Sequence, residues 1–222
     1  MKIDIAVVDY GMGNLRSVSK ALEHVAPEKM VRVTSNPDEI MQATRVVFPG
    51  QGAMPDCIRE MDMLGLRDAV TFAAKNKPFL GICIGLQMLF ERSEEGDIAG
   101  LGLFAGHVKK FAQDDMHILN DQTQQNEKLK VPHMGWNEVY QVSENARPHA
   151  LWHNINHGER FYYVHSYYVQ PAESKVISGY SNYPKRFTSA IAQDNLFAVQ
   201  FHPEKSAYAG LQLLTNFVAW KP

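Results

Sequence analysis

A cysteine placed between two glycines is the feature of this chain that points most directly to chemistry. Gly81-Ile82-Cys83-Ile84-Gly85 lies where an apolar run turns amphipathic. Small residues two positions before and after a nucleophile let a strand turn sharply into a helix, with the middle residue held exposed above the sheet. The start of a helix there would favour the thiolate of Cys83, and the N–H of Ile84 would be free to stabilise an oxyanion. A buried structural cysteine is the alternative for this motif taken alone.

A candidate base for this nucleophile lies near the other end of the chain, in AVQFHPEKS. Pro203 disfavours helical backbone at His202, so this segment is expected to be extended. In extended backbone His202 and Glu204 would project from the same side, and the carboxylate could orient the imidazole. A lone His-Pro pair is more often a strand end. Together with Glu204 and the upstream cysteine, the segment predicts a Cys-His-Glu triad.

Two further glycines follow the apolar run RVVF, in PGQGAM. Gly50 and Gly52 would let backbone N–H groups approach a ligand closely. Beside the cysteine, the N–H groups of Gln51 and Gly52 would complete an oxyanion hole with that of Ile84. Taken alone, the segment could equally be a turn that ends a strand.

Apolar runs alternate with helical patterns and predict the elements that position these residues. Strands are expected at 3–10, 31–35, 45–50 and 78–83, and helices at 15–25, 66–77 and 208–220. After Gly100 closely spaced apolar runs at 102–111, 160–170 and 196–204 predict an antiparallel part. The polar, aperiodic segment 112–130 is expected to be a surface loop. The expected fold is α/β, an open, mixed and largely parallel sheet with helices on both faces, in one domain spanning 1–222.

The composition excludes several classes of protein. The chain has 222 residues, 45% of them hydrophobic and 21% charged, which is typical of a soluble globular domain. A formal net charge of −2 gives no footprint for nucleic acid. The longest nearly apolar run, 78–90, is too short to span a bilayer, and the first residues lack the pattern of a secretory signal. Because Cys57 and Cys83 cannot make a disulfide framework, we expect reduced thiols and a cytoplasmic location.

Two other patterns do not favour a cofactor. His149, His153 and His157 are spaced four apart, as metal ligands on one helix face would be, but the intervening Asn and Gly residues weaken a helix. We expect these histidines to lie in an exposed turn region. GMGN near the N-terminus lacks the third glycine of a dinucleotide-binding loop. Neither a metal nor a nucleotide cofactor is predicted.

PGQG, GICIGLQ and QFHPE, in this order, resemble the motifs of the class I glutamine amidotransferases. DYGMGNLRSV, VPHMGWNEV, FYYVHSYYV and VQFHPEKS resemble the branch of that family that serves histidine biosynthesis. The likeness runs from the first predicted strand to the last predicted helix. Gln51 stands where valine is common, and the loop at 112–130 is longer than usual.

The resemblance implies that Cys83, His202 and Glu204 hydrolyse glutamine to glutamate and ammonia through a γ-glutamyl thioester. Glutamine would be held by Gly50, Gly52, Gln87, Glu95 and the backbone of Ser166 and Tyr167. The ammonia would pass to a separate cyclase subunit of (β/α)8 type, which makes imidazole glycerol phosphate in a heterodimer with this chain. That partner would contact Asn14, Met134, Trp136 and Lys205. On the residues alone, Trp136 could equally be a core residue of a strand.

Two alternative functions remain open on the sequence. The same triad could supply ammonia to another synthase, such as one that aminates a surface sugar. A cysteine peptidase or γ-glutamyl hydrolase of similar architecture is the other alternative, although GLQ after the cysteine and VHSYY argue against it.

Overall fold

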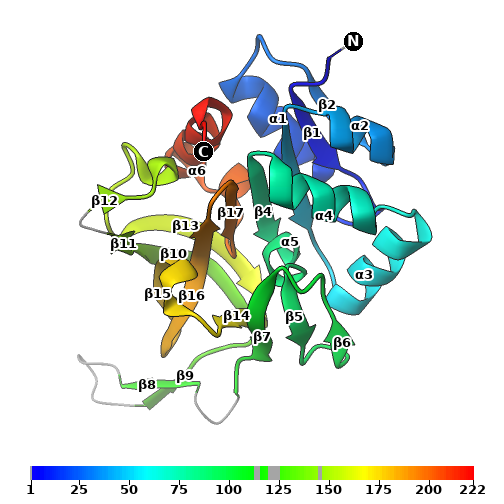
Figure 1. Ribbon diagram of the computed structural model, residues 1–222. Helices are drawn as coiled ribbons and strands as arrows, with labels where there is room; N and C mark the ends of the chain where they lie inside the picture. Colours follow the sequence, from blue (N-terminus) through cyan, green and yellow to red (C-terminus); the bar gives the residue numbers. More distant parts are fainter. Residues whose placement is uncertain (1, 113–115, 120–125, 145–146) are drawn as a thin grey trace.

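The computed structural model describes residues 2–112, 116–119, 126–144 and 147–222 of the chain (Figure 1). The α-helices are α1 (Leu15–Val25), α2 (Pro37–Gln42), α3 (Met54–Met63), α4 (Arg67–Asn76), α5 (Ile84–Gln87) and α6 (Ala207–Ala219), and short 3-10 turns are η2 (Ala150–Trp152), η3 (Ser174–Val176) and η4 (Pro203–Lys205). In the described part of the chain, no helix is long and apolar enough to cross a membrane.

The strands are β1 (Ile5–Val8), β2 (Val31–Thr34), β3 (Arg45–Gly50), β4 (Phe79–Cys83), β5 (Phe90–Ser93), β6 (Ile98–Ala99), β7 (Phe104–Lys110), β8 (His117–Leu119), β9 (Asn126–Lys128), β10 (His133–Gln141), β11 (Ser143–Glu144), β12 (Arg147–Pro148), β13 (Glu159–His165), β14 (Tyr167–Pro171), β15 (Ile177–Asn182), β16 (Arg186–Gln193) and β17 (Leu196–Val199). Thirteen of them form one sheet, whose main path runs β2-β1-β3-β4-β17-β16-β14-β7-β5-β6. Strands β10, β13 and β15 extend that sheet beside β16.

The sheet is parallel in its N-terminal part and antiparallel in much of the rest. Strands β2, β1, β3, β4 and β17 are neighbours that run in parallel. From β17 onward, β16, β14 and β7 follow in antiparallel pairs. The mixed α/β fold predicted from the sequence is confirmed. The runs at 102–111 and 160–170 form antiparallel pairs as expected, whereas the run at 196–204 forms β17, which is antiparallel to β16 but parallel to β4.

The central parallel strands lie in the core. Every residue of β1 and of β4 is buried, as expected for continuous apolar runs with helices packed over them. Helix α1 packs against α6, α2 against α4, and α3 against α5. Figure 1 shows the carboxyl end of β4 leading into α5 near the middle of the molecule, where the predicted nucleophile lies.

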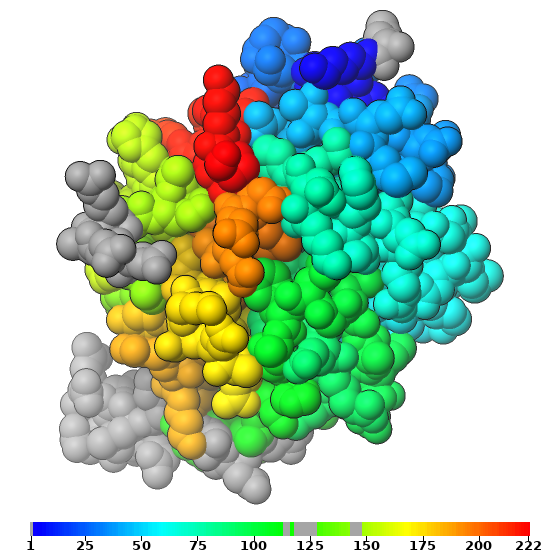
Figure 2. Space-filling model, in the orientation of Figure 1, coloured from blue at the N-terminus to red at the C-terminus, as the bar shows by residue number. Residues whose placement is uncertain are grey.

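The C-terminal helix joins segments that are far apart in the sequence. Nδ2 of Asn216 donates a hydrogen bond to the carbonyl of Leu151 at 2.9 Å, and Nη1 of Arg45 donates one to the carbonyl of Phe217 at 2.8 Å. In Figure 2 the last residues (red) lie between the early part of the chain (blue) and the region around residue 150 (yellow-green).

Two predicted elements differ from the structure. The run 160–170 is not one strand, because β13 ends at His165 and β14 begins at Tyr167, on either side of Ser166. The segment 112–130 was predicted to be a loop, but its described residues include an antiparallel pair, β8 with β9. A hydrogen bond from the N–H of Leu129 to the carbonyl of buried Met116 closes that pair at its base. Residues 113–115 and 120–125 lie outside the described part of the chain.

Candidate active site

Cys83 lies at a sharp turn between β4 and α5. Its backbone has φ 56° and ψ −110°, a conformation that residues other than glycine rarely adopt. A Cβ added to Gly81 would lie 2.9 Å from the Cβ of Ala198, and one added to Gly85 would lie 1.9 Å from the carbonyl oxygen of Phe48. The glycines are therefore needed for close packing on both sides of the turn, as the spacing predicts.

The helix that follows Cys83 is much shorter than the amphipathic run predicts. Helix α5 ends at Gln87, and the chain re-enters the sheet as β5 from Phe90. Backbone hydrogen bonds from Leu101 to Met88 and from Leu103 to Leu89 bind this stretch to a neighbouring segment instead of to a further helical turn. A single turn has a weak dipole, so stabilisation of a Cys83 thiolate must come largely from nearby side chains.

His202 and Glu204 form a buried pair. Nδ1 of His202 lies 2.9 Å from Oε1 of Glu204, and their side chains are 3% and 1% exposed. The expectation that both lie on extended backbone is wrong for Glu204, which belongs to η4. Pro203 is favourable at the first position of a helical turn, and this turn brings Glu204 back onto the imidazole. The Oγ of Ser206 donates to the carbonyl of His202 at 2.6 Å and holds the segment in place.

The charge state of His202 depends on its two neighbours. Burial by itself would lower the pKa of His202, but the nearby charge of Cys83 and the charge and hydrogen bond of Glu204 outweigh burial and raise the pKa to about 10. Nε2 of His202 has no hydrogen-bond partner among the described residues. An imidazolium between a thiolate and a carboxylate is the arrangement that a cysteine nucleophile with a positioned base requires.

A chain of buried amides, which the sequence analysis missed, also reaches the nucleophile. Nε2 of Gln200 donates to Sγ of Cys83 at 3.8 Å, and its Oε1 accepts from Nε2 of Gln87 at 3.1 Å. Gln87 also donates to the carbonyl of Tyr167 at 3.0 Å. Gln200 is fully buried within an otherwise apolar run, LFAVQF, and that buried polar position is the signal by which it could have been found.

A cavity of about 300 Å³ opens over Cys83. It is lined by Gln51, Gly52, Cys83, Ile84, Gln87, Glu95, Pro132, Val164, His165, Ser166, Tyr167 and His202. The structure thus brings together all the predicted catalytic, oxyanion and substrate residues except Gly50 and Glu204, which lie behind the wall. A Cβ on Gly50 would come within 2.5 Å of the Tyr10 hydroxyl, so only glycine fits there. Gln87 Oε1 is buried and has no partner in the described part of the chain, so it can accept a hydrogen bond from a ligand.

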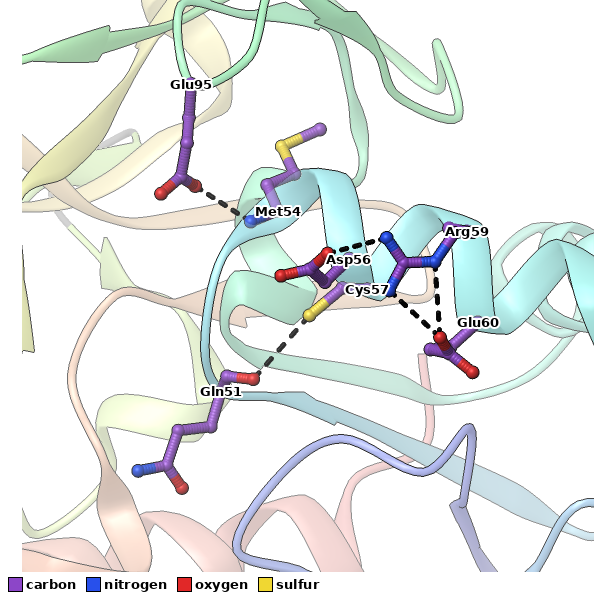
Figure 3. Close-up of polar contacts among 7 residues, drawn as sticks. All are labelled: Gln51, Met54, Asp56, Cys57, Arg59, Glu60 and Glu95. Carbon is purple, nitrogen blue, oxygen red and sulfur yellow. Dashed lines mark hydrogen bonds and ion pairs between the residues drawn. The ribbon is translucent and has the colours of Figure 1, made fainter.

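Two side chains hold the PGQG segment from the side of the core. The hydroxyl of Tyr10 donates to the carbonyl of Pro49 at 2.7 Å, and the thiol of Cys57 lies 3.6 Å from the carbonyl of Gln51 (Figure 3). Burial raises the pKa of Cys57 to about 11, so this cysteine stays a neutral donor. Gly52 has φ 107°, which favours glycine.

Glu95 lies where the cavity meets the start of α3. One of its carboxylate oxygens, Oε2, accepts a hydrogen bond from the backbone N–H of Met54 at 2.8 Å (Figure 3). A carboxylate at a helix N-terminus is electrostatically favourable, and this contact fixes the orientation of the Glu95 side chain. Its place in the cavity wall suits it to a cationic group of a ligand.

The predicted partner residues are exposed at Met134 and Trp136 and half-buried at Asn14 and Lys205. Met134 is 62% and Trp136 is 51% exposed, so Trp136 is not a core residue. The indole of Trp136 contacts the ring of Tyr162 edge-on at 6.2 Å, and Nζ of Lys205 lies 5.9 Å from the same ring. Asn14 immediately precedes α1, which contacts η4, the turn that contains Lys205.

One of the three spaced histidines is not in an exposed turn, contrary to the expectation. His153 and His157 are exposed, but His149 is partly buried against the ring of Phe197, at 4.8 Å. Nδ1 of His149 accepts the N–H of Leu151 at 3.2 Å and so caps η2. Burial lowers the pKa of His149 to about 4, which keeps its ring neutral.

Solved structures of similar fold include other glutamine-hydrolysing proteins. A glutamine amidotransferase from Thermotoga maritima aligns with a TM-score of 0.59 at 14% identity, over 94% of this chain and 79% of that one. The glutaminase domain of the Trypanosoma brucei CTPS, solved with bound acivicin, aligns with a TM-score of 0.62 at 19% identity, over 100% and 96% of the two chains. At these identities the likeness establishes the fold.

Sequence relatives are much closer. Imidazole glycerol phosphate synthase subunit HisH of Nitrosospira multiformis is 63% identical over 99% of both chains. The protein of the same name from Thiobacillus denitrificans is 61% identical over all of this chain and 93% of its own length. The family model described as "Glutamine amidotransferase class-I" matches residues 6–220. The chain therefore belongs to the class-I glutamine amidotransferase family.

Proposed function

We propose that this chain is the glutaminase subunit of an imidazole glycerol phosphate synthase, with a role in histidine biosynthesis. It hydrolyses glutamine to glutamate and ammonia and delivers the ammonia to a cyclase subunit. The observation that carries the proposal is the buried His202–Glu204 pair beside Cys83, at the floor of a cavity lined by the predicted substrate residues. The names of relatives at about 60% identity supply the reaction that consumes the ammonia.

The geometry accounts for each step of the hydrolysis. The Cys83 thiolate attacks the side-chain carbonyl carbon of glutamine, and the N–H groups of Ile84 and Gly52 stabilise the oxyanion. His202 then donates its proton to the departing nitrogen, so the C–N bond breaks and ammonia leaves a γ-glutamyl thioester. His202 next takes a proton from water, which attacks the thioester and releases glutamate and the thiol. Glu204 keeps the imidazole oriented and stabilises its cationic form.

Substrate recognition follows from the groups in the cavity wall. Glu95 is held by the N–H of Met54 and can receive the α-ammonium of glutamine on its carboxylate. The free Oε1 of Gln87 accepts a further donor from the substrate. The backbone of Ser166 and Tyr167 forms the opposite side.

The subunit naming of the relatives supports a partner. The exposed side chains of Met134 and Trp136, with half-buried Lys205 beside them, support the place where it binds. We propose a heterodimer with a (β/α)8 cyclase in the cytoplasm. Ammonia that enters solution at neutral pH is largely protonated, which makes direct transfer to a partner necessary for efficient use.

The test is an ammonia-transfer assay on the protein co-purified with a histidine-pathway cyclase subunit. Glutamate release and imidazole glycerol phosphate formation from glutamine should appear together, and both should be lost in Cys83→Ala. Glutamate release without any stable cyclase complex would favour a different synthase partner. Hydrolysis of γ-glutamyl peptides in preference to free glutamine would overturn the proposal.

A further inference from the structure

Two buried histidines next to the cavity have no part in the proposed hydrolysis. His133 begins β10 and His165 ends β13, and they face each other directly across the antiparallel pair. His133 is 3% exposed and His165 is 5% exposed. Nδ1 of His133 lies 2.9 Å from Nε2 of His165. Buried imidazoles in direct contact impose a definite hydrogen-bonding pattern on each other.

The pattern of donors and acceptors follows from the groups at the two ends of this hydrogen-bonded series, the Tyr167 carbonyl and the Asn137 amide. Nδ1 of His165 lies 2.8 Å from the carbonyl oxygen of Tyr167, which can only accept, so Nδ1 carries the hydrogen. In a neutral ring, Nε2 of His165 is then an acceptor, and Nδ1 of His133 must donate to it. Nε2 of His133 in turn accepts from Nδ2 of Asn137 at 3.3 Å.

The orientation of the Asn137 amide agrees with this assignment. Its Nδ2 also donates to the carbonyl of Asn182 at 3.0 Å, and its Oδ1 accepts the N–H of Glu138 at 2.8 Å. A flipped amide would place oxygen against oxygen at Asn182. The donors therefore run in one direction, from Asn137 through His133 and His165 to the carbonyl of Tyr167.

The surroundings keep both rings neutral. His133 stacks on the ring of Tyr183 at 3.9 Å and on that of Tyr163 at 4.9 Å, and Phe111 contacts His165 at 5.2 Å. Burial lowers the pKa of His133 to about 4 and, together with His133, lowers the pKa of His165 to about 3. Neutral rings are what the one-directional chain of donors requires.

The chain of donors ends at the point where the cavity wall is least supported by the sheet. Strand β13 stops at His165 and β14 starts at Tyr167, so the backbone at Ser166 passes from one pairing to another. The His165 imidazole spans this break by binding the Tyr167 carbonyl two residues along its own chain. The same carbonyl accepts a hydrogen bond from Nε2 of Gln87, a residue that also lines the cavity.

We infer that His133 and His165 are positioning residues, which fix the Ser166–Tyr167 backbone and the Gln87 amide in the conformation that binds glutamine. The inference rests on the proposed function and adds residues to its substrate site. Neither histidine contacts Cys83, so the pair acts on binding of glutamine and leaves the reactivity of the sulfur unchanged.

The experiment compares steady-state kinetics of the complex with the cyclase for four variants. His165→Leu removes the contact to Tyr167 and should raise KM for glutamine about tenfold, the cost of one well-placed hydrogen bond, while kcat changes less than about threefold. His165→Asn keeps an N–H at the position of Nδ1 and should restore KM to within about threefold of the unmodified protein. His133→Leu leaves Nε2 of His165 without a donor and should raise KM by a smaller factor.

The matched control is His149→Leu, which removes another partly buried neutral imidazole that packs on Phe197, outside the cavity lining. It should lower thermal stability without changing KM. Alkylation of Cys83 by iodoacetamide should proceed at the same rate in all folded variants. If His165→Leu fails to fold, His133→Leu and His165→Asn carry the comparison.

An unchanged KM in His165→Leu, or in His133→Leu should the former not fold, would overturn the inference. So would equal losses in the Leu and Asn variants at position 165, because that result means that packing alone matters. If the unmodified complex releases no glutamate, the proposed function fails, and this outcome is separate from failure of the histidine pair.

Discussion

The side-chain amide nitrogen of Gln200 lies 3.8 Å from the sulfur of Cys83, and both residues are buried. An N–H aimed at sulfur stabilises a thiolate more than a thiol, because hydrogen bonds to charged groups are the stronger ones. Since α5 is a single turn, this amide supplies support that a longer helix would otherwise give.

Gln200→Leu should therefore slow alkylation of Cys83 by iodoacetamide at pH 7 about tenfold, as expected for loss of one hydrogen bond to a charged group. Gln200→Glu should slow it further, because a carboxylate would face the thiolate. Gln193→Leu, at an exposed position on β16, is the control and should react normally. Equal alkylation rates in all three variants would remove Gln200 from the activation of the nucleophile.

The two cysteines should differ in reactivity. A glutamine-analogue electrophile should label Cys83 once per chain and leave Cys57 unlabelled, because burial raises the pKa of Cys57 to about 11 and keeps it a thiol. Cys83→Ala should abolish glutamate release, whereas Cys57→Ser, which keeps a donor for the Gln51 carbonyl, should retain most of it. Mass spectrometry of the labelled peptide decides, and label on Cys57 would contradict the assignment.

His202 and Glu204 should not be equivalent. His202→Ala removes proton transfer altogether, whereas Glu204→Gln keeps a side chain of the same size that can still contact Nδ1. We expect the first to reduce kcat by about a thousandfold or more and the second by a smaller factor. Both are measured in the complex with the cyclase. A larger loss in Glu204→Gln would mean that the roles of acid–base and orienting group are assigned wrongly.

The buried histidines should make the protein sensitive to mild acid. In the unfolded chain they titrate near pH 6.5, but in the folded protein burial lowers the pKa of His133 to about 4 and of His165 to about 3. Between about pH 6.5 and 4 the unfolded state binds protons that the folded state does not, so the free energy of unfolding falls as pH falls. Each histidine contributes a slope of up to about 1.4 kcal/mol per pH unit.

Urea unfolding between about pH 6.5 and 4.5 measures that slope. The variant His133→Asn should lose less stability over this range than the unmodified protein does, whatever its stability at neutral pH. His153→Asn, at an exposed position, should keep the original slope. Parallel curves for His133→Asn and the unmodified protein would show that His133 is already protonated in the folded state.

Features of this molecule that depend on residues close in sequence could be predicted, whereas contacts between distant segments could not. The turn at Cys83 was predictable because Gly81 and Gly85 are close in sequence and each is required by packing. The apolar runs that form β1, β3 and β4 were predictable for a similar reason, since buried parallel strands are continuous in apolar character.

What the sequence did not reveal depends on pairing between distant segments. The contact of His133 with His165 follows from the register of β10 with β13, and nothing in either motif specifies that register. The contact of Gln200 with Cys83 follows from the parallel pairing of β17 with β4. The 3-10 turn at Glu204 was missed because Pro203 was considered only for its effect on the preceding residue and not as the start of a turn.

The PGQG segment gives the last prediction, a dependence of glutamine hydrolysis on the partner. The carbonyl of Gln51 is directed toward Cys57, and in a trans peptide the N–H of Gly52 points the opposite way. Rotation of this peptide would break the Cys57 contact and change φ of Gly52 from 107° to a negative value. Glycine adopts positive and negative values of φ with similar ease. The Cys57 contact holds the orientation in which the Gly52 N–H is available to the oxyanion, and the partner is expected to favour this orientation over the rotated one.

A missing oxyanion donor costs about a hundredfold to a thousandfold in turnover. Glutamate release should therefore be lower by about that factor in the isolated glutaminase than in the complex with the cyclase and its nucleotide ligand. Gly52→Ala disfavours the φ of 107° that this orientation requires, and its Cβ would lie 2.9 Å from Cε of Met12, so the rate of the complex should fall toward that of the isolated glutaminase. Gly65→Ala, at φ 66° on the surface loop after α3, carries the same type of backbone strain away from the site and should leave the ratio unchanged. An isolated glutaminase that already works at the rate of the complex would show that this segment is not a switch.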